Sequence, residues 1–513
     1  MIAKIESACL IGMEAARVQV EVNLSKGMPS FSIVGLPDAS VREAKDRVVA
    51  AIRNTGFEFP SRRVTVNLAP ADLRKEGACF DLAIAVGILL ASEAVVPKRV
   101  PRCLWLGELA LDGSIRRVRG ALPLARSLSR QANSSLVLPW ENIEEVSYLS
   151  GIKLFPFRDL RSVVRWLNAE GAPEPFAAAS AWKPAPYDNI VDFSEIKGQM
   201  VAKRGLEIAA AGGHNLLMIG SPGTGKSMLA QALPGILPSW NLQEALDATQ
   251  VHSVANALVG IGLLPHRPYR NPHHSVSPVG LLGGGDIPSP GEISLAHRGV
   301  LFLDELPEFR RDALEALRQP LEQGMVHIHR ARGRATYPSD FLLVAAMNPC
   351  PCGFRGHPKK ECQCSTVKIQ NYMGKISGPL LDRIDLHVEL PALKMDELFD
   401  EKKKSESSAV VKARVENARQ LQESRYQDVK HRPRDNAHLT PRDMKRHADL
   451  TPEGEAILRA TVERLGLSAR SFDRLRKVAR TIADLEACEK IQARHLAEAI
   501  QYRCLDRQGG MSW

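Results

Sequence analysis

The stretch Gly220-Ser221-Pro222-Gly223-Thr224-Gly225-Lys226-Ser227 decides the fold class of this chain. It matches G-x-x-x-x-G-K-S/T at every position, a pattern whose glycines let backbone N–H groups wrap around phosphates. An apolar run, Leu216–Ile219, precedes it, and a helical pattern, Met228–Leu233, follows it. A strand, a phosphate-binding loop and a helix in this order predict an α/β domain that binds ATP. Within the loop, Lys226 is expected to reach the β- and γ-phosphates and the Ser227 hydroxyl to bind Mg²⁺.

A second apolar strand ends in two acidic residues. Val300–Leu303 is followed directly by Asp304 and Glu305. Asp304 is predicted to complete the Mg²⁺ shell and Glu305 to polarise the attacking water. Many strands end in Asp, so the signal becomes specific only because the phosphate-binding loop lies upstream.

Two more polar residues could complete such a site. A third strand, Phe341–Met347, ends at Asn348, which could orient water against the γ-phosphate or only cap the next turn. Arg383 could stabilise transition-state charge in a neighbouring subunit. It could equally form a surface salt bridge with Asp382 or Asp385, and the residues alone do not separate these alternatives.

Length and composition describe a folded chain of several domains. Its 513 residues suggest about three domains, and the apolar (44%) and charged (25%) fractions are those of globular proteins. The net charge of +10 favours a polyanionic partner only weakly. The longest apolar run, Leu82–Ala91, is shorter than the roughly 20 residues that span a bilayer, and residues 1–22 lack a signal-peptide core. We therefore expect a cytoplasmic protein with no membrane partner.

The chain divides into three segments and a linker. Residues 1–168 mix strand-like and helix-like runs, and residues 169–190 are rich in Ala and Pro without periodicity, as in a linker. Residues 191–395 contain the nucleotide motifs. Residues 396–513 are predominantly helical in pattern.

Residues 325–337 have the pattern of a β-hairpin with a basic tip. Apolar and polar residues alternate on both sides of an R-G-R turn. Arg330, Arg332 and Arg334 could grip DNA phosphates in a salt-sensitive manner that is independent of base sequence. The alternative is a charged tip that only faces water.

Four cysteines form two C-x-C pairs: Cys350 with Cys352, and Cys362 with Cys364. In a cytosolic protein, four thiols so close together indicate zinc more than disulfides. The C-x-C spacing is tighter than the usual C-x-x-C, so a reduced loop without metal remains open. A zinc ion here would brace the loop that follows Asn348.

Two adjacent histidines lie in a glycine-rich segment between the nucleotide motifs. His273 and His274 could bind a metal, contact DNA or support the strand that ends at Asp304. No spaced partner pair accompanies them, so a metal is the weakest of the three readings.

Longer motifs resemble one family. They are RPYRNPHH at 267–274, GLLGGG at 280–285, PGEISLAH at 290–297, DELPEF at 304–309 and NPCPCG at 348–353. The chain resembles, over nearly its whole length, the magnesium-chelatase-like branch of the AAA+ ATPases. Within that branch it is most similar to the competence-associated ComM/YifB group of hexameric branch-migration helicases.

The resemblance implies roles for the residues above. It makes 220–227 the Walker A motif, Asp304 and Glu305 the Walker B pair, Asn348 sensor 1 and Arg383 the arginine finger. It adds Arg470, at the start of a C-terminal helix, as a sensor 2 that contacts ATP from a helical lid formed by 396–513. An ordinary solvent-facing arginine is the alternative for Arg470. In this branch the hairpin before sensor 1 points into the central pore of the ring.

Residues 1–168 resemble the peptidase-like domain of Lon, which has a ribosomal-S5-type α/β fold. Cys79 stands where that protease has its serine nucleophile, and Leu122 stands where it has its lysine. Because a nucleophile needs an activating base, we expect an inactive domain that serves assembly or DNA binding. Arg116, Arg117 and Arg119 would give it a basic edge.

The resemblance implies a homohexameric, ATP- and Mg²⁺-dependent motor that acts on single-stranded or branched DNA without sequence preference. Its task would be branch migration in homologous recombination during natural transformation. The main alternative is a chelatase-type AAA+ motor that acts on a protein partner without DNA, which the Lon-like domain disfavours. The missing lysine disfavours a peptidase, and the intact Asp304–Glu305 pair disfavours a non-enzymatic scaffold.

Overall fold

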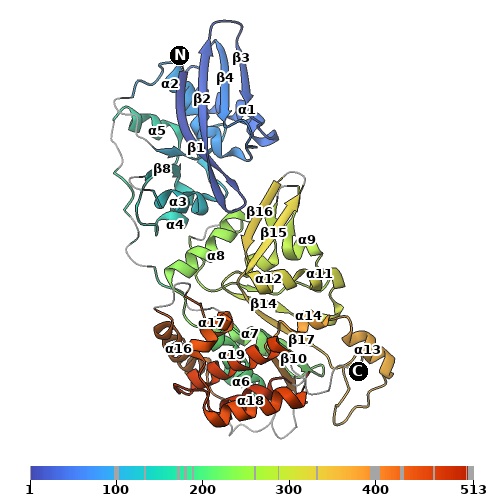
Figure 1. Ribbon diagram of the computed structural model, residues 1–513. Helices are drawn as coiled ribbons and strands as arrows, with labels where there is room; N and C mark the ends of the chain where they lie inside the picture. Colours follow the sequence, from blue (N-terminus) through green and yellow to red (C-terminus); the bar gives the residue numbers. More distant parts are fainter. Residues whose placement is uncertain are drawn as a thin grey trace.

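A computed structural model gives the fold of residues 2–97, 103–131, 134–169, 174–177, 179, 182–185, 187, 190–258, 262–286, 288–330, 333–392, 405–427, 432–465, 468–503 and 505. Figure 1 shows an elongated molecule whose N-terminal domain, central domain and C-terminal helices follow one another along its length. The predicted fold class, mixed α/β with a parallel sheet and a C-terminal helical region, is confirmed. No helix among these residues is both long enough and apolar enough to cross a membrane.

The N-terminal domain is built on a seven-stranded mixed sheet in the order β3-β4-β2-β1-β5-β8-β9. Its strands are β1 (Ile2–Ile11), β2 (Glu14–Ser25), β3 (Ser30–Val34), β4 (Arg63–Ala69), β5 (Leu104–Trp105), β8 (Ser134–Pro139) and β9 (Ile152–Phe157), with a small hairpin of β6 (Glu108–Leu109) and β7 (Ile115–Arg116). Its helices are α1 (Ala39–Asn54), α2 (Asp81–Ala91), α3 (Ala121–Ser129), α4 (Ile143–Val146) and α5 (Leu160–Leu167). Alternation in β2 buries Val18, Val20 and Val22 on one face, as a period of two requires.

The central domain holds a five-stranded sheet in the order β11-β14-β17-β10-β18. These strands are β10 (Leu216–Gly220), β11 (Tyr269–Arg270), β14 (Val300–Leu303), β17 (Leu342–Met347) and β18 (Leu386–Leu390), and every pairing is parallel. Strands β10, β14 and β17 are buried at every position, which is why they are continuous apolar runs in the sequence. Because the strands are parallel, the residues that follow them collect where the carboxyl ends of the strands meet. We call this side the carboxyl edge of the sheet.

Helices and two small hairpins surround this sheet. The helices are α6 (Met200–Gly212), α7 (Lys226–Ala232), α8 (Leu242–Val254), α9 (Pro278–Leu282), α10 (Glu292–Leu295), α11 (Arg311–Ala316), α12 (Arg318–Gln323), α13 (Thr366–Met373) and α14 (Gly378–Leu381). The hairpins are β12 (Gly283–Gly284) with β13 (Ser289–Pro290), and β15 (Met325–Arg330) with β16 (Gly333–Pro338). The predicted hairpin at 325–337 is thereby confirmed.

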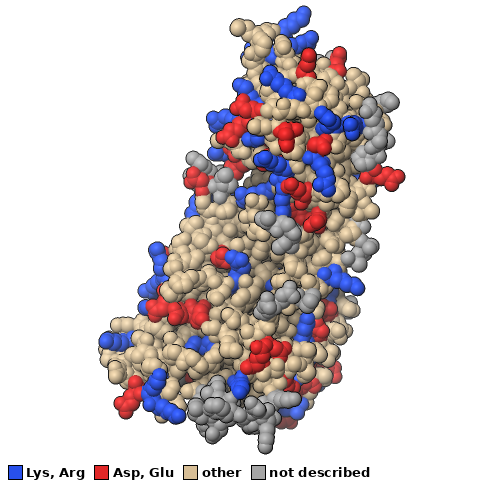
Figure 2. Space-filling model, turned by 180° about the vertical axis from the view of Figure 1, so that it is seen from behind, with Lys and Arg blue, Asp and Glu red and all other residues tan. Residues whose placement is uncertain are grey.

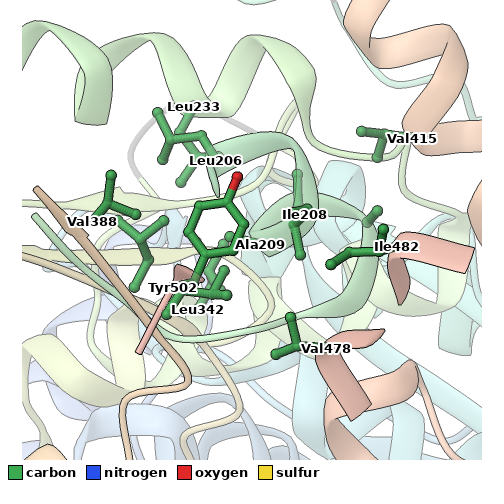
Figure 3. Packing of buried hydrophobic residues seen from close by; sticks show 14 of the residues in the cluster. Leu206, Ile208, Ala209, Leu233, Leu342, Val388, Val415, Val478, Ile482 and Tyr502 are labelled. Carbon is green, nitrogen blue, oxygen red and sulfur yellow. The ribbon is translucent and has the colours of Figure 1, made fainter. Parts of the chain in front are cut away.

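The C-terminal helices pack onto one face of the central sheet. They are α16 (Ser408–Arg425), α17 (Pro441–His447), α18 (Pro452–Leu465), α19 (Ala469–Leu485) and α20 (Ala493–Gln501). Figure 3 shows part of this shared core, in which Ile208 and Ala209 of α6 lie between Val388 of β18 and the α19 residues Val478 and Ile482. The helical region is therefore attached to the nucleotide domain through a common apolar core rather than by a linker alone.

The N-terminal domain contacts the central domain at two places. The turn between β1 and β2 reaches the hairpin, where a Cβ built at Gly12 would lie 3.1 Å from the Cβ of Ala335 in β16. At α8, the buried Ser253 hydroxyl donates to Glu145 at 2.7 Å, and the Gly120 amide donates to the Ser253 carbonyl at 3.2 Å. The hairpin and α8 therefore lie directly beneath the N-terminal domain (Figure 1).

Candidate nucleotide site

The phosphate-binding loop joins β10 to α7, as the sequence predicts. Gly223 and Gly225 adopt φ values of +81° and +90°, a left-handed conformation that favours glycine. A Cβ built at either glycine would meet nothing within 4 Å, so a ligand can approach the loop backbone on that side. This geometry fits a bound polyphosphate.

Lys226 lies at the centre of the site. Its ammonium donates to the carbonyls of Gly220 at 2.7 Å and Ser221 at 3.0 Å, and to the Asn348 side-chain oxygen at 3.2 Å. Burial lowers the pKa of this ammonium, and the carboxylates of Asp304 and Glu305 oppose that shift. The sheet order places β17 beside β10, so Asn348 lies within reach of the lysine.

The two residues predicted to hold Mg²⁺ are in contact. The Ser227 hydroxyl donates to an Asp304 carboxylate oxygen at 2.8 Å. A hydroxyl and a carboxylate at this spacing are the oxygen ligands that Mg²⁺ takes beside nucleotide phosphates. The residues therefore fit the ion that the phosphate-binding loop implies.

Glu305 follows Asp304 in a left-handed backbone conformation, with φ of +52°. The His274 ring nitrogen Nδ1 lies 3.3 Å from a Glu305 carboxylate oxygen. This contact favours the third reading of the adjacent histidines, support for the acidic pair. His273 stacks beside His274 with ring centroids 4.1 Å apart.

Arg383 lies at the opposite side of the same sheet, where the amino ends of the strands meet, which we call the amino edge. It precedes β18, whose first residue Leu386 pairs with Leu216 at the start of β10, whereas the phosphate-binding loop follows the end of β10. Five residues of strand separate the two edges by about 15 Å. Arg383 is buried, and its guanidinium donates to the Pro379 carbonyl and to Glu322.

Arg470 is also found at this distant edge. It begins α19 with its side chain 66% exposed, and its guanidinium lies 4.0 Å from Glu322, the residue that also binds Arg383. The two arginines therefore share one carboxylate and lie on the same side of the domain. From this position neither arginine can reach the phosphate-binding loop of its own chain.

The hairpin presents a polar outer face. Val326, Ile328, Ala335 and Tyr337 point inward and are buried, whereas His327, His329, Arg330, Arg334 and Thr336 are exposed. Arg330 and Arg334 thus lie where the sequence predicts them, and Arg332 is outside the described residues.

Comparison with known proteins places this geometry in a family. Residues 192–398 match the family described as magnesium chelatase, subunit ChlI, residues 405–503 its C-terminal region, and residues 20–142 the family described as subunit ChlI of Mg-chelatase. The chain is 44% identical to the protein YifB of Salmonella typhimurium over 507 residues, which cover 99% of this chain and 98% of the relative. It is 42% identical to Competence protein ComM of Haemophilus influenzae over 509 residues, again 99% of this chain and 98% of the relative.

The chain belongs to the ComM/YifB family of magnesium-chelatase-like AAA+ proteins. The chain is also 26% identical to the magnesium-chelatase 67 kDa subunit of Chlorobaculum parvum over 166 residues. These residues cover 31% of this chain and 24% of that subunit. The near-complete coverage of the ComM and YifB relatives includes the N-terminal domain.

In this ComM/YifB family member, Leu122 belongs to the apolar core of the N-terminal domain, and the half-buried Cys79 packs against that core. Burial raises the pKa of the Cys79 thiol well above its ordinary value, and its sulfur lies 3.6 Å from the Ala8 carbonyl. Leu122 is fully buried in α3. Two arginines of the predicted basic edge are engaged, because Arg117 pairs with Glu145 at 3.4 Å and Arg119 donates to the Val254 carbonyl of α8.

Sequence reasoning missed Glu322 and the contact beneath the phosphate-binding loop. Glu322 is an unremarkable helix residue in the sequence, and only the fold brings it to Arg383 and Arg470. The loop after Asn348 folds back so closely that a Cβ at Gly353 would lie 2.5 Å from Pro222. Only the Gly at 353, with φ of +80°, hints at a close approach in that loop.

Proposed function

We propose that this chain is an ATP-driven DNA motor that works as a ring, most simply a homohexamer, and promotes branch migration during natural transformation. The observation that carries the proposal is a pair of contacts, Lys226 with Asn348 and Ser227 with Asp304. They occur in a chain that matches a competence protein from end to end. The relative's name concerns that protein, and we extend its role to this chain.

The residues of the carboxyl edge would divide the work of hydrolysis. MgATP supplies the phosphoanhydride to be cleaved, with the metal neutralising charge on its β- and γ-oxygens. Lys226 would exchange its carbonyl partners for phosphate oxygens, and Ser227 with Asp304 would hold the metal. Glu305 would take a proton from the attacking water, and Asn348 would orient that water.

The two arginines of the distant edge would act on a neighbouring subunit. The length of strands β10 and β18 separates Arg383 and Arg470 from the phosphate-binding loop of their own chain. The two arginines would therefore complete a nucleotide site across an interface between subunits. Arg383 would leave Glu322 for the γ-phosphate, and Arg470 would approach the same nucleotide from the lid. This arrangement makes ATP turnover depend on assembly.

DNA contact would come from the β15–β16 hairpin. Figure 2 shows basic and acidic side chains interspersed over the face it displays, so a broad basic surface does not account for binding there. The hairpin instead offers exposed Arg330 and Arg334 beside His327 and His329. In a ring these side chains would line the pore and contact phosphates without reading bases.

The N-terminal domain would support assembly or DNA binding without peptidase activity. The surroundings of Cys79 raise the pKa of its thiol well above the ordinary value, which disfavours a thiolate nucleophile, and Leu122 supplies no base. Through its contacts with the hairpin and with α8, the domain would respond to DNA bound at the hairpin.

The test is ATP turnover with and without single-stranded and forked DNA, at low and moderate salt. We expect DNA to stimulate turnover and salt to weaken the effect. In the double variant Arg330→Ala/Arg334→Ala, the ratio of stimulated to unstimulated turnover should fall toward one. The slope of log binding constant against log salt should shrink by about 1.4, since each lost single-strand phosphate contact is worth about 0.7.

Arg459→Ala, a change at an exposed helix position, is the matched control and should leave the stimulation intact. If none of the DNA substrates changes the rate of ATP turnover, the proposal of a DNA motor would be excluded. It would favour the chelatase-type motor acting on a protein partner.

A further inference from the structure

Four cysteine side chains converge in the loop between β17 and α13. Their sulfur atoms all lie within 4.8 Å of one another. The Sγ of Cys350 is 3.4 Å from that of Cys352 and 3.6 Å from that of Cys362, and the Sγ atoms of Cys352 and Cys362 are 3.6 Å apart. Cys350 is fully buried, and the other three, Cys364 included, are half-buried.

These spacings are those of a tetrahedral metal site. Zn–S bonds of about 2.3 Å in a tetrahedron put the sulfurs about 3.8 Å apart, close to the separations here. A disulfide would need about 2.05 Å, and all four thiols are free. The geometry points to a structural zinc ion held by Cys350, Cys352, Cys362 and Cys364, which fixes the loop at 348–365 against the phosphate-binding loop.

The backbone around the sulfurs is already arranged as an outer shell. The backbone N–H groups of Arg355 and Phe354 are hydrogen-bonded to the Cys350 and Cys352 sulfurs, and that of Cys352 to the Cys364 sulfur. Hydrogen bonds of this kind orient thiolate ligands and disperse their charge. Four protein ligands leave no open position, so the ion would be structural rather than catalytic.

The loop needs a support of this kind. Residues 348–365 contain no helix or strand, and connections longer than about 15 residues without one are uncommon in compact domains. Its other internal contacts are small, such as Lys360 over the Phe354 ring at 4.7 Å. A single ion joining both ends of the loop would close it with little other structure.

The loop held in this way touches the nucleotide site. Cys350 follows Asn348 by two residues, and the Asn348 backbone is hydrogen-bonded to the Tyr372 hydroxyl of α13. Gly353 lies so close to Pro222 that any side chain there would collide with the proline ring. Zinc would therefore hold Asn348 and the phosphate-binding loop in register, a consequence that rests on the proposed ATP site.

The first experiment measures metal in the full-length chain. We expect about one zinc per chain after purification without added metal, and a sulfur-to-cobalt charge-transfer band with tetrahedral d–d bands when Co²⁺ replaces it. Cys362→Ser should lower the zinc content at least about fivefold. Cys79→Ser, at a half-buried cysteine of the N-terminal domain, should keep it. Absent zinc together with an absent cobalt band in the wild type would overturn the site, whether or not any variant folds.

The second experiment removes zinc from the wild-type chain with a strong chelator and measures binding of a fluorescent ATP analogue. We expect the affinity for the analogue to fall about tenfold, the size of effect that the loss of an outer-shell contact has at other sites. The affinity should return when zinc is added back. Unchanged affinity after proven zinc loss would overturn the link to the ATP site. A chain that holds zinc yet never binds ATP would instead refute the proposed function and leave the metal site standing.

Discussion

The two edges of the central sheet differ in how complete they are. At the carboxyl edge, Lys226, Ser227, Asp304 and Asn348 already contact one another in pairs, as they would around a nucleotide. At the amino edge, Arg383 and Arg470 converge on Glu322, a carboxylate of their own chain. On the proposed mechanism, the carboxyl edge would bind the nucleotide of its own chain, whereas the arginines of the amino edge would act on the nucleotide of a partner subunit.

This difference would make hydrolysis depend on assembly if the proposed function holds. Each chain would then carry the binding half of one site and, about 15 Å away, the arginines of another. Glu322 contacts the buried Arg383 in the single chain, so on the proposed mechanism an isolated chain would leave its own nucleotide without an arginine finger. The comparison yields predictions that separate the two edges.

The largest effect is expected at the carboxyl edge. Lys226→Ala removes the only ammonium that touches both the loop carbonyls and Asn348 among the described contacts, and should lower ATP turnover at least about 100-fold. Steady-state phosphate release measures it. Lys368→Ala, an exposed lysine on α13, is the control and should keep turnover within about twofold. Undiminished activity in Lys226→Ala would remove the site assignment.

A similar loss by a different route is expected at the amino edge. Arg383→Ala should abolish turnover, because the transition state loses a cation, yet leave ATP affinity within about threefold. Equilibrium binding of a labelled nucleotide, measured together with turnover, distinguishes a loss of catalysis from a loss of ATP affinity. A parallel loss of affinity would place Arg383 in its own chain's site.

Mixing the two variants tests the separation of the edges directly. An Arg383→Ala chain keeps an intact carboxyl edge, and a Lys226→Ala chain keeps an intact amino edge. Interfaces that join these two edges should recover part of the wild-type turnover. Two inactive proteins that stay inactive in every ratio, although they co-assemble, would contradict action across an interface.

The carboxyl edge could be predicted almost entirely from the sequence. The glycine pattern at 220–227, the apolar run ending at Asp304 and the run ending at Asn348 are local signals, and parallel strands bring their ends together. The hairpin could be predicted equally well, because apolar and polar residues alternate along its strands as buried and exposed positions do. The cysteine spacing singled out four residues, and the fold brings their sulfur atoms to within 4.8 Å of one another.

The amino edge could not be predicted in the same way. Glu322 meets Arg383 and Arg470 through contacts between α12, the segment after α14 and α19, which no local pattern encodes. The approach of Gly353 to Pro222 likewise depends on how a loop without regular structure folds back. The basic edge was predicted as a surface feature, and Arg116 and Arg119 are indeed exposed, but no local pattern encodes the bond from Arg119 to the Val254 carbonyl of α8.

A smaller effect is expected from His274, which adjoins the carboxyl edge. Its ring nitrogen lies 3.3 Å from Glu305, so His274→Ala should leave the base less well positioned and lower kcat about tenfold with little change in KM. His274→Asn, which can still donate a hydrogen bond, should recover part of kcat. His329→Ala, on the exposed hairpin, is the control. A rise in KM alone would mean that His274 serves nucleotide binding instead.

The amino edge is tied to the helical region by a cluster of charges. Asp340, just before β17, accepts from Arg434 at 2.8 Å and lies 3.2 Å from the His438 ring nitrogen Nε2. His438 also pairs with the buried Asp435 at 2.5 Å. The charge of Asp435, with help from Asp340 and against the effect of burial, raises the pKa of His438 to about 9.

The smallest effect should therefore appear as a pH-dependent stability. Because the folded-state pKa of His438 lies above its ordinary value of 6.5, its stabilisation is complete below about pH 6.5 and is lost as the pH rises toward 9. His438→Gln should lower Tm by roughly 2–4 °C at pH 6, a modest amount because the side chain is 44% exposed, and by much less at pH 9.5. Thermal melts of both chains across this range, with His329→Gln as the control, measure the difference. A Tm difference that does not shrink with rising pH would show that packing, rather than the imidazolium charge, joins the helical region to the amino edge.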